Sequence, residues 1–127
     1  MSIIELKEIK SIDEIKLMVD TFYDNVNKDE LLSPIFNDIA GVNWELHLPK
    51  MYGFWNSILF GTGEYNGQPF PPHLKLPINQ THFDRWIELF NKTIDDLFIG
   101  EKAVEVKMRA ATIARVFSSK ITMLKSQ

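Results

Sequence analysis

Four stretches of this chain repeat apolar residues at steps of three and four positions, and this spacing limits the possible folds more than any other feature. An α-helix completes a turn every 3.6 residues, so such steps place the apolar side chains on one face of a helix. A half-buried strand would instead alternate apolar and polar residues, and no stretch of the chain does so. The sequence therefore predicts an all-α fold.

The first predicted helix follows Ser11, which forms a capping-box pattern with Glu14 three residues later. Its apolar face consists of Ile12, Ile15, Val19, Phe22 and Val26. Tyr23 lies beside this face and is expected to point toward the same interior. The pattern ends near residues 27–29, and Ser33-Pro34 then begins a corner that carries Ile35 and Phe36.

A second helix is predicted from about Asn43 to Phe60. Its inner face consists of Trp44, Leu48, Met51, Trp55 and Ile58. Pro49 removes a backbone donor within this segment, so the first turn is expected to be separate or distorted and the regular helix to begin near Leu48. Gly61 is expected to end the helix.

Two further helices are predicted in the second half of the chain. Thr81 is expected to cap the third, which ends at Gly100, and the fourth runs from Glu101 to about Leu124. The inner face of the third consists of Phe83, Trp86, Ile87, Phe90, Ile94 and Leu97, and that of the fourth of Val106, Ala110, Ile113, Phe117 and Ile121.

The segment from Gly61 to Thr81 is the unusual part of the chain. It holds three of the six glycines and four of the six prolines, and loops of roughly twenty residues are uncommon inside a domain. Its apolar residues, which are Phe70, Leu74, Leu76 and Ile78, argue against disorder. The chain has no cysteine to fix the loop. A large planar ligand bonded to His73 would order it.

Composition limits the function classes. A chain of 127 residues fits one domain, expected to span residues 1–127. The absence of cysteine excludes thiol nucleophiles, zinc–cysteine sites and iron–sulfur clusters. A net charge of −3 without basic runs argues against nucleic acid. With neither a signal-peptide pattern nor a membrane-spanning apolar stretch, we expect a cytoplasmic protein that does not bind membranes.

The three histidines, His47, His73 and His82, each allow a purely structural interpretation. A lone histidine in a loop is more often a surface residue or a core hydrogen-bonding group than a metal ligand. His47 could be a solvated residue near a helix start, although it lies one turn before Met51 on the inner face. His82, next to Thr81, is expected to be solvated and structural.

The aromatic residues Tyr23, Phe36, Trp55 and Trp86 could likewise be ordinary core residues. A buried tyrosine or tryptophan still needs a partner for its O–H or N–H group. If these donors and His47 converged on one cavity, they would form a polar cluster that an ordinary core avoids. The spacing alone leaves this open.

The order of several motifs resembles the truncated haemoglobins of group III. The motifs are F-Y-D-N-V-N-K-D at 22–29, P-I-F at 34–36, W-x-x-H-L-P-K-M-Y-x-F-W at 44–55, Y-N-G-Q-P at 65–69, H-L-x-L-P at 73–77 and H-F-D-R-W at 82–86. They cover nearly the whole chain at compatible spacings. The resemblance implies a truncated globin-like, two-over-two helical sandwich around a haem b, with a long proline-rich loop carrying the proximal histidine.

The same resemblance assigns roles to individual residues. It places His73 at the proximal iron ligand and Tyr23, His47 and Trp86 at polar positions on the distal side, with Met51 as an apolar wall. Phe36 and Trp55 are expected to line the haem pocket. Lys50 and Arg85 are the expected cationic partners of the haem propionates.

We expect a monomer that binds O₂, NO or CO, and three functions remain open. The protein could bind, carry or sense such gases. It could be a redox enzyme that detoxifies NO or peroxide with an external reductase, since no flavin or nicotinamide fingerprint is present. Two charge-assisted hydrogen bonds to bound O₂ would slow its release roughly 10²-fold, which favours chemistry over storage. Alternatively, the chain could be a cofactor-free helical interaction module.

Overall fold

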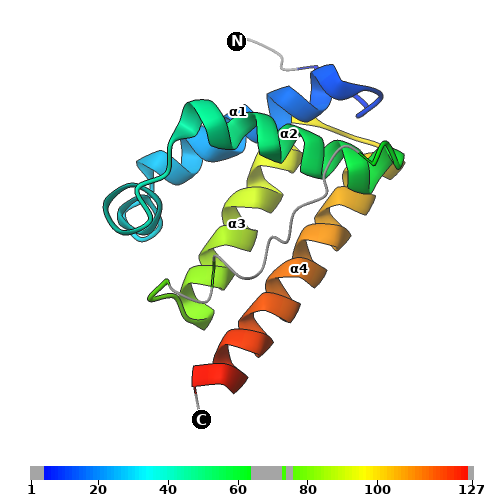
Figure 1. Ribbon diagram of the computed structural model, residues 1–127. Helices are drawn as coiled ribbons and strands as arrows, with labels where there is room; N and C mark the ends of the chain where they lie inside the picture. The colour runs from blue at the N-terminus through cyan, green and yellow to red at the C-terminus, as the bar shows by residue number, and fades with distance from the viewer. Residues whose placement is uncertain (1–4, 64–72, 74–75, 126–127) are drawn as a thin grey trace.

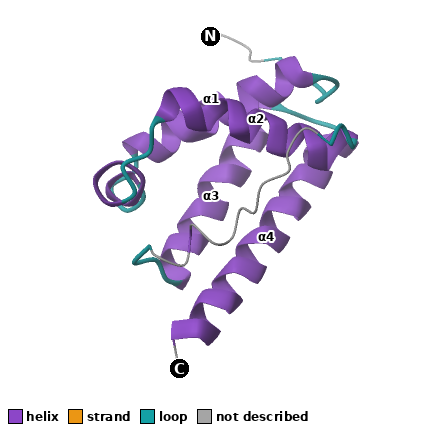
Figure 2. Cartoon of the chain, viewed as in Figure 1, coloured by secondary structure: helices purple, strands orange, loops and turns teal. Residues whose placement is uncertain are grey.

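The computed structural model describes residues 5–63, 73 and 76–125, and within these ranges the secondary structure is helical (Figures 1 and 2). The elements are α1 (Ile12–Lys28), the π-helix η1 (Pro34–Ile39), α2 (Trp44–Phe60), α3 (Gln80–Leu97) and α4 (Glu101–Lys125). One isolated parallel bridge joins Lys7 to Phe98. The prediction of an all-α fold is confirmed.

The helices form two packed pairs. α3 lies beside α4, and α1 and α2, which pack on each other, run across them (Figure 1). α1 also contacts α3, and α2 contacts α4. This arrangement confirms the predicted two-over-two helical sandwich. No helix among the described residues has both the length and the apolar character needed to span a membrane.

α1 forms where the capping box and the apolar spacing predict it. The Ser11 side chain accepts a hydrogen bond from the Asp13 N–H at 3.3 Å, and Glu14 accepts one from the Ser11 N–H at 3.0 Å. These bonds satisfy backbone donors that the first helical turn leaves without partners. The helix ends at Lys28, as its sequence pattern indicates.

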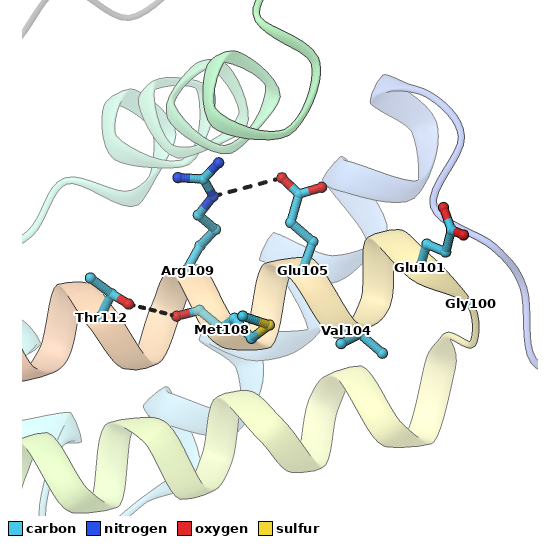
Figure 3. A pocket seen from close by; sticks show the side chains of 7 residues that line it. All are labelled: Gly100, Glu101, Val104, Glu105, Met108, Arg109 and Thr112. Carbon is cyan, nitrogen blue, oxygen red and sulfur yellow. Dashed lines mark hydrogen bonds and ion pairs between the residues drawn. The ribbon is translucent and has the colours of Figure 1, made fainter.

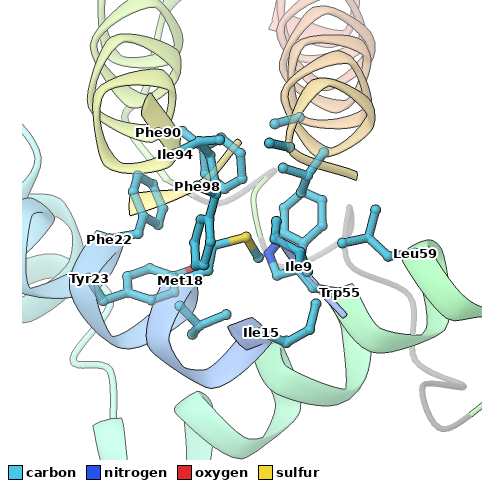
Figure 4. Close-up of a cluster of buried hydrophobic side chains, with 14 of the residues drawn as sticks. Ile9, Ile15, Met18, Phe22, Tyr23, Trp55, Leu59, Phe90, Ile94 and Phe98 are labelled. Atoms are coloured by element: carbon cyan, nitrogen blue, oxygen red, sulfur yellow. The ribbon is translucent and has the colours of Figure 1, made fainter. Parts of the chain in front are cut away.

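The main core lies where the helices meet (Figure 4). Ile15 and Phe22 of α1 pack with Phe90 and Ile94 of α3, and all four are at most 2% exposed. The rings of Phe22 and Phe90 meet nearly edge-on, with their centroids 5.1 Å apart. Burial of such large apolar side chains contributes roughly 1.5–3 kcal/mol each to folding.

The predicted start of α2 near Asn43 is confirmed, but the expected break before Leu48 is wrong, because the helix is continuous from Trp44 through Pro49. The His47 N–H already bonds the Asn43 carbonyl at 2.8 Å, so helical bonding begins before the proline. Pro49 lacks the N–H that would bond the Glu45 carbonyl. Both Pro49 and Glu45 are exposed, so water can satisfy that carbonyl. Gly61 ends α2 in the left-handed conformation (φ 66°), as expected.

The start of α3 also differs from the prediction, because Asn79 and not Thr81 is the N-cap. The Asn79 side chain accepts the Thr81 N–H at 3.0 Å. His82 completes a capping box by accepting the Asn79 N–H on Nδ1 at 3.1 Å. A histidine in this role was missed because Glu or Gln is the usual residue there. α3 ends at Leu97, before Gly100.

Part of the predicted loop lies outside the described residues: Phe70, Leu74, the motif at 65–69 and Pro71-Pro72. Ile78, at the end of the loop, is buried in a second small core with Ile35 and Phe83. Burial of this loop residue agrees with the expectation that apolar side chains of the segment pack inward.

Candidate functional site

A pocket lies between α1, η1, α2, α3 and α4, and is lined mainly by aromatic and aliphatic side chains. The space between its lining atoms, including its open mouth, is about 940 Å³. The polar side chains on its wall belong to Tyr23, His47, His73, His82 and Trp86. All three histidines of the chain therefore meet at one pocket, although they come from α2, the loop and α3.

The structure brings together most of the residues singled out in the sequence. Seven of them line this pocket: Tyr23, Phe36, His47, Met51, Trp55, His73 and Trp86. The two predicted cations, Lys50 and Arg85, do not belong to the lining. The pocket residues also include Leu76 and Ile78 from the end of the loop and Ile113 and Phe117 from α4.

His47 presents a buried nitrogen that has no hydrogen-bond partner. Its Nε2 atom is the one buried side-chain nitrogen or oxygen without a partner found among the described residues. The ring contacts the rings of Tyr23 and Trp44, with centroids 5.6 Å away in each case. Burial, followed by the nearby charges of Lys50 and His73, lowers the pKa of His47 from its usual 6.5. His47 is therefore neutral at pH 7, and Nε2 can exchange one hydrogen bond with a ligand.

Tyr23 supplies a second polar group to the same pocket wall. Its residue is 8% exposed, and its ring packs against Phe36 and Trp44 at centroid distances of 5.9 and 5.1 Å. Burial raises the pKa of the Tyr23 phenol well above 10. The phenol therefore stays protonated at any physiological pH and can act as a hydrogen-bond donor.

Trp86 is held in place by the aromatic core below the pocket. Its ring stacks on Phe90 at 5.5 Å with an interplanar angle of 16°, and it meets the edge of Phe22 at 5.4 Å. These two neighbours are almost fully buried. The indole ring is consequently carried by a rigid support, as a group that orients a ligand requires.

His73 reaches the pocket from the loop and is half-buried. Its ring contacts Phe117 of α4 at a centroid distance of 5.1 Å and a tilt of 59°. Its carbonyl accepts the Leu76 N–H at 3.2 Å. A neutral imidazole in such a position can act as a metal ligand.

Arg85 is engaged elsewhere. Its guanidinium contacts the Asp29 carboxylate through two nitrogens, at 2.7 and 2.6 Å, and also contacts Glu88 at 3.0 Å. Asp29 is almost fully buried and additionally accepts the N–H groups of Leu31 and Leu32. Arg85 thus ties the end of α1 to α3. Lys50 is exposed on α2.

A second hollow lies along α4, between Gly100 and Thr112 (Figure 3). Val104 and Met108 in it are 55% and 65% exposed, and Glu105 and Arg109 form an ion pair at 3.7 Å. Its lining contains no histidine and no aromatic ring. The pocket with the three histidines is therefore the better candidate for a functional site.

Known proteins resemble this chain in both sequence and architecture. The model of the bacterial-like globin family matches residues 8–119. The chain is 36% identical over 111 residues to the group 3 truncated haemoglobin of Campylobacter jejuni, covering 84% of this chain and 87% of that protein.

Solved structures show the same likeness. The crystal structure of group III truncated haemoglobin from Campylobacter jejuni superposes with a TM-score of 0.84 and 34% identity, covering 92% of this chain and 95% of that one. A tryptophan-to-leucine mutant of the group II truncated haemoglobin from Bacillus anthracis superposes with a TM-score of 0.74 and 28% identity, covering 87% and 85% of the two chains. This chain thus belongs to the bacterial-like globin family, as a truncated haemoglobin of group III, and is a haem-binding protein that takes a diatomic gas as ligand.

Proposed function

We propose that residues 1–127 form one domain that holds haem b through His73 and binds O₂, NO or CO beside Tyr23, His47 and Trp86. The observation that carries this proposal is the buried, unpartnered Nε2 of His47 in a pocket that His73 also lines. A buried polar atom without a partner costs roughly 1–3 kcal/mol. Such a cost is reasonable where a ligand supplies the missing partner.

The residues of the pocket fit a haem. Met51, Phe36 and Trp55 offer apolar contacts suited to the faces and edges of a porphyrin, and the pocket is partly open. His73 is the proposed iron ligand, because it comes from a separate wall and contacts Phe117, whereas His47 lies against Tyr23. When bound, haem would supply an iron atom that accepts a diatomic ligand.

The donors of the pocket determine what happens to such a ligand. Tyr23 is the proposed principal donor, since its phenol stays protonated, and Trp86 is the second. His47 is the proposed proton carrier or gate, because it is neutral and its Nε2 has no other partner. Hydrogen bonds to a charged acceptor contribute about 1.5–3 kcal/mol each, so two of them would slow ligand release roughly 10²-fold or more.

Slow release favours chemistry on the bound gas over its storage. We propose that the physiological reaction is the conversion of NO to nitrate or the reduction of peroxide, with electrons from an external reductase. Rapid O₂ release, with no turnover of NO or peroxide in the presence of a supplied reductant, would contradict this reaction class. It would leave gas binding intact.

Titration of the purified protein with haemin tests the binding function. A Soret band should form with the wild-type protein and with His47→Ala, whereas His73→Ala should lose stable haem binding. His47→Ala is the matched control because it removes a histidine from the same pocket. A folded wild-type protein that takes up no haemin would indicate a cofactor-free module, and a five-coordinate, histidine-ligated spectrum retained in His73→Ala would refute the ligand assignment.

A further inference from the structure

His82 has a fixed orientation at the wall of the histidine-lined pocket. It is the third residue of α3, and its Nδ1 accepts the N–H of the N-cap residue Asn79 at 3.1 Å. The Asn79 Oδ1 atom also lies 3.2 Å from this nitrogen, but it already accepts the Thr81 N–H at 3.0 Å. The Asn79 N–H always carries its proton, so it is best satisfied when Nδ1 carries none and the ring proton is on Nε2. The capping box therefore favours the tautomer in which Nε2–H is a donor.

His82 is half-buried at the pocket wall, so this donor is open to a ligand. The residue lines the pocket together with Phe83, Leu76 and Ile78, whose side chains are apolar and offer it no acceptor. No hydrogen bond of Nε2 is found among the described residues. The start of α3 adds the partial positive charge of a helix N-terminus, which favours an anion at this position.

The chemistry of the cofactor restricts what can accept this hydrogen bond. The periphery of haem b carries methyl and vinyl groups, which accept no strong hydrogen bonds, and two carboxylates, which do. We propose that His82 donates its Nε2–H to a haem carboxylate and so anchors one edge of the porphyrin. This inference rests on the proposed haem binding. It transfers to His82 the role that the sequence suggested for Arg85, whose guanidinium is held by Asp29.

Two substitutions separate this role from the capping role of the same residue. Gln and Glu are both suited to the third position of a capping box, so His82→Gln and His82→Glu should each preserve the start of α3. His82→Gln also retains an N–H donor, whereas His82→Glu places a negative charge beside the carboxylate. His82→Ala removes both the cap and the donor.

The test is the rate of haem transfer from the ferric protein to excess apomyoglobin. We expect His82→Gln to remain within about threefold of wild type, and His82→Ala and His82→Glu to lose haem at least about tenfold faster, which corresponds to roughly 1.4 kcal/mol. After reconstitution with haem dimethyl ester, which lacks the carboxylates, the differences between wild type, His82→Gln and His82→Glu should disappear, whereas His82→Ala can retain the effect of the lost cap.

Different results would contradict the role of His82 and the proposed haem binding. If His82→Glu releases haem as slowly as wild type, or if its faster release persists with the dimethyl ester, then His82 acts only as a helix cap and the inference is wrong. If the wild-type protein binds neither form of haem, the proposed function itself fails. Thermal unfolding of the apoproteins checks that His82→Gln and His82→Glu have preserved the helix.

Discussion

The core around Phe90 and the pocket around His47 are built from the same helices, but the core is filled by apolar contacts whereas the pocket contains a buried polar atom without a partner. In the core, Phe22, Phe90 and Ile94 fill the space between α1 and α3 with apolar contacts (Figure 4). One turn along α3 from Phe90, Trp86 lines a pocket in which the buried Nε2 of His47 has no partner. The first region stabilises the fold. The second contains an unpartnered nitrogen that costs stability, and we propose that a bound ligand offsets this cost.

The junction between the two regions is an ion pair with a buried carboxylate, Asp29, and a half-exposed guanidinium, Arg85. Asp29 follows the last residue of α1, and Arg85 directly precedes Trp86 on α3. The pair holds the two helices together at the level where the packing changes from the filled core to the histidine-lined pocket. The contrast between the regions can therefore be tested at the core, at the junction and in the pocket.

The largest effect is expected for Phe90→Ala. Removal of a fully buried aromatic side chain leaves a cavity and should lower the free energy of unfolding by about 3–5 kcal/mol. Urea denaturation of the apoprotein measures the change, with the substitution of an exposed residue, Leu46→Ala, as the control. A loss below about 1 kcal/mol would mean that this region is not the stabilising core.

The next effect is expected for Asp29→Asn at the junction. Burial of the carboxylate by itself would raise its pKa, but the bonds from Arg85 and from the backbone of Leu32 and Leu31 outweigh it and hold the pKa below 3.8. A depressed pKa in the folded state adds stability at neutral pH, and this stability is lost as the pH falls through the folded pKa.

Asp29→Asn should therefore cost about 2 kcal/mol at pH 7, and the difference from wild type should shrink below about pH 4. Denaturant unfolding at pH 7, 5 and 3.5 measures it. Lys92→Gln, which breaks an exposed ion pair with Asp96, is the matched control and should change stability by less than about 0.5 kcal/mol. A difference that is the same at every pH would contradict the role given to the carboxylate.

A smaller effect is expected for Tyr23→Phe in the haem-loaded protein. Loss of one hydrogen bond to bound O₂ should speed its dissociation at least about tenfold, or roughly 1.4 kcal/mol. Stopped-flow displacement of O₂ by CO measures the rate, and the apoprotein should unfold at nearly the same denaturant concentration as wild type. An unchanged rate would remove Tyr23 as the principal donor.

The smallest effect is expected for His47→Leu in the apoprotein, and it has the opposite sign. An apolar side chain of similar size removes the unpartnered nitrogen, so the free energy of unfolding should rise by about 1 kcal/mol. His82→Gln is the control, because its capping hydrogen bond is preserved and its stability should stay close to wild type. A loss of stability in His47→Leu would show that the His47 ring is satisfied without a ligand.

The sequence predicted the core better than the pocket. The steps of three and four residues placed Phe22, Phe90 and Ile94 correctly, because periodicity depends on local geometry alone. The continuity of α2 was not predicted. It depends on the exposure of Glu45, one turn before Pro49, and exposure is set by the tertiary structure. The motif resemblance indicated His73 and His47, but convergence of residues from separate helices cannot be read from spacing.

His82 and Arg85 show which polar contacts the sequence could not reveal. Arg85 was expected to be a cationic partner of a haem propionate, and its bond to Asp29, 56 positions away, could not be foreseen because only the fold brings the two residues together. His82 was expected to be solvated and structural. Its structural role is confirmed by the cap at Asn79, but the residue is half-buried and also lines the pocket. An asparagine three residues before the histidine was the available signal.

Resonance Raman spectroscopy of the ferrous, ligand-free protein tests the assignment of His73 most directly, through the iron–imidazole stretching band. The band should be present in wild type, His47→Leu and His82→Gln, disappear in His73→Gly, and return at a shifted frequency when imidazole is added to His73→Gly. Retention of the unshifted band in His73→Gly, together with its loss in His47→Leu, would contradict the assignment and make His47 the iron ligand.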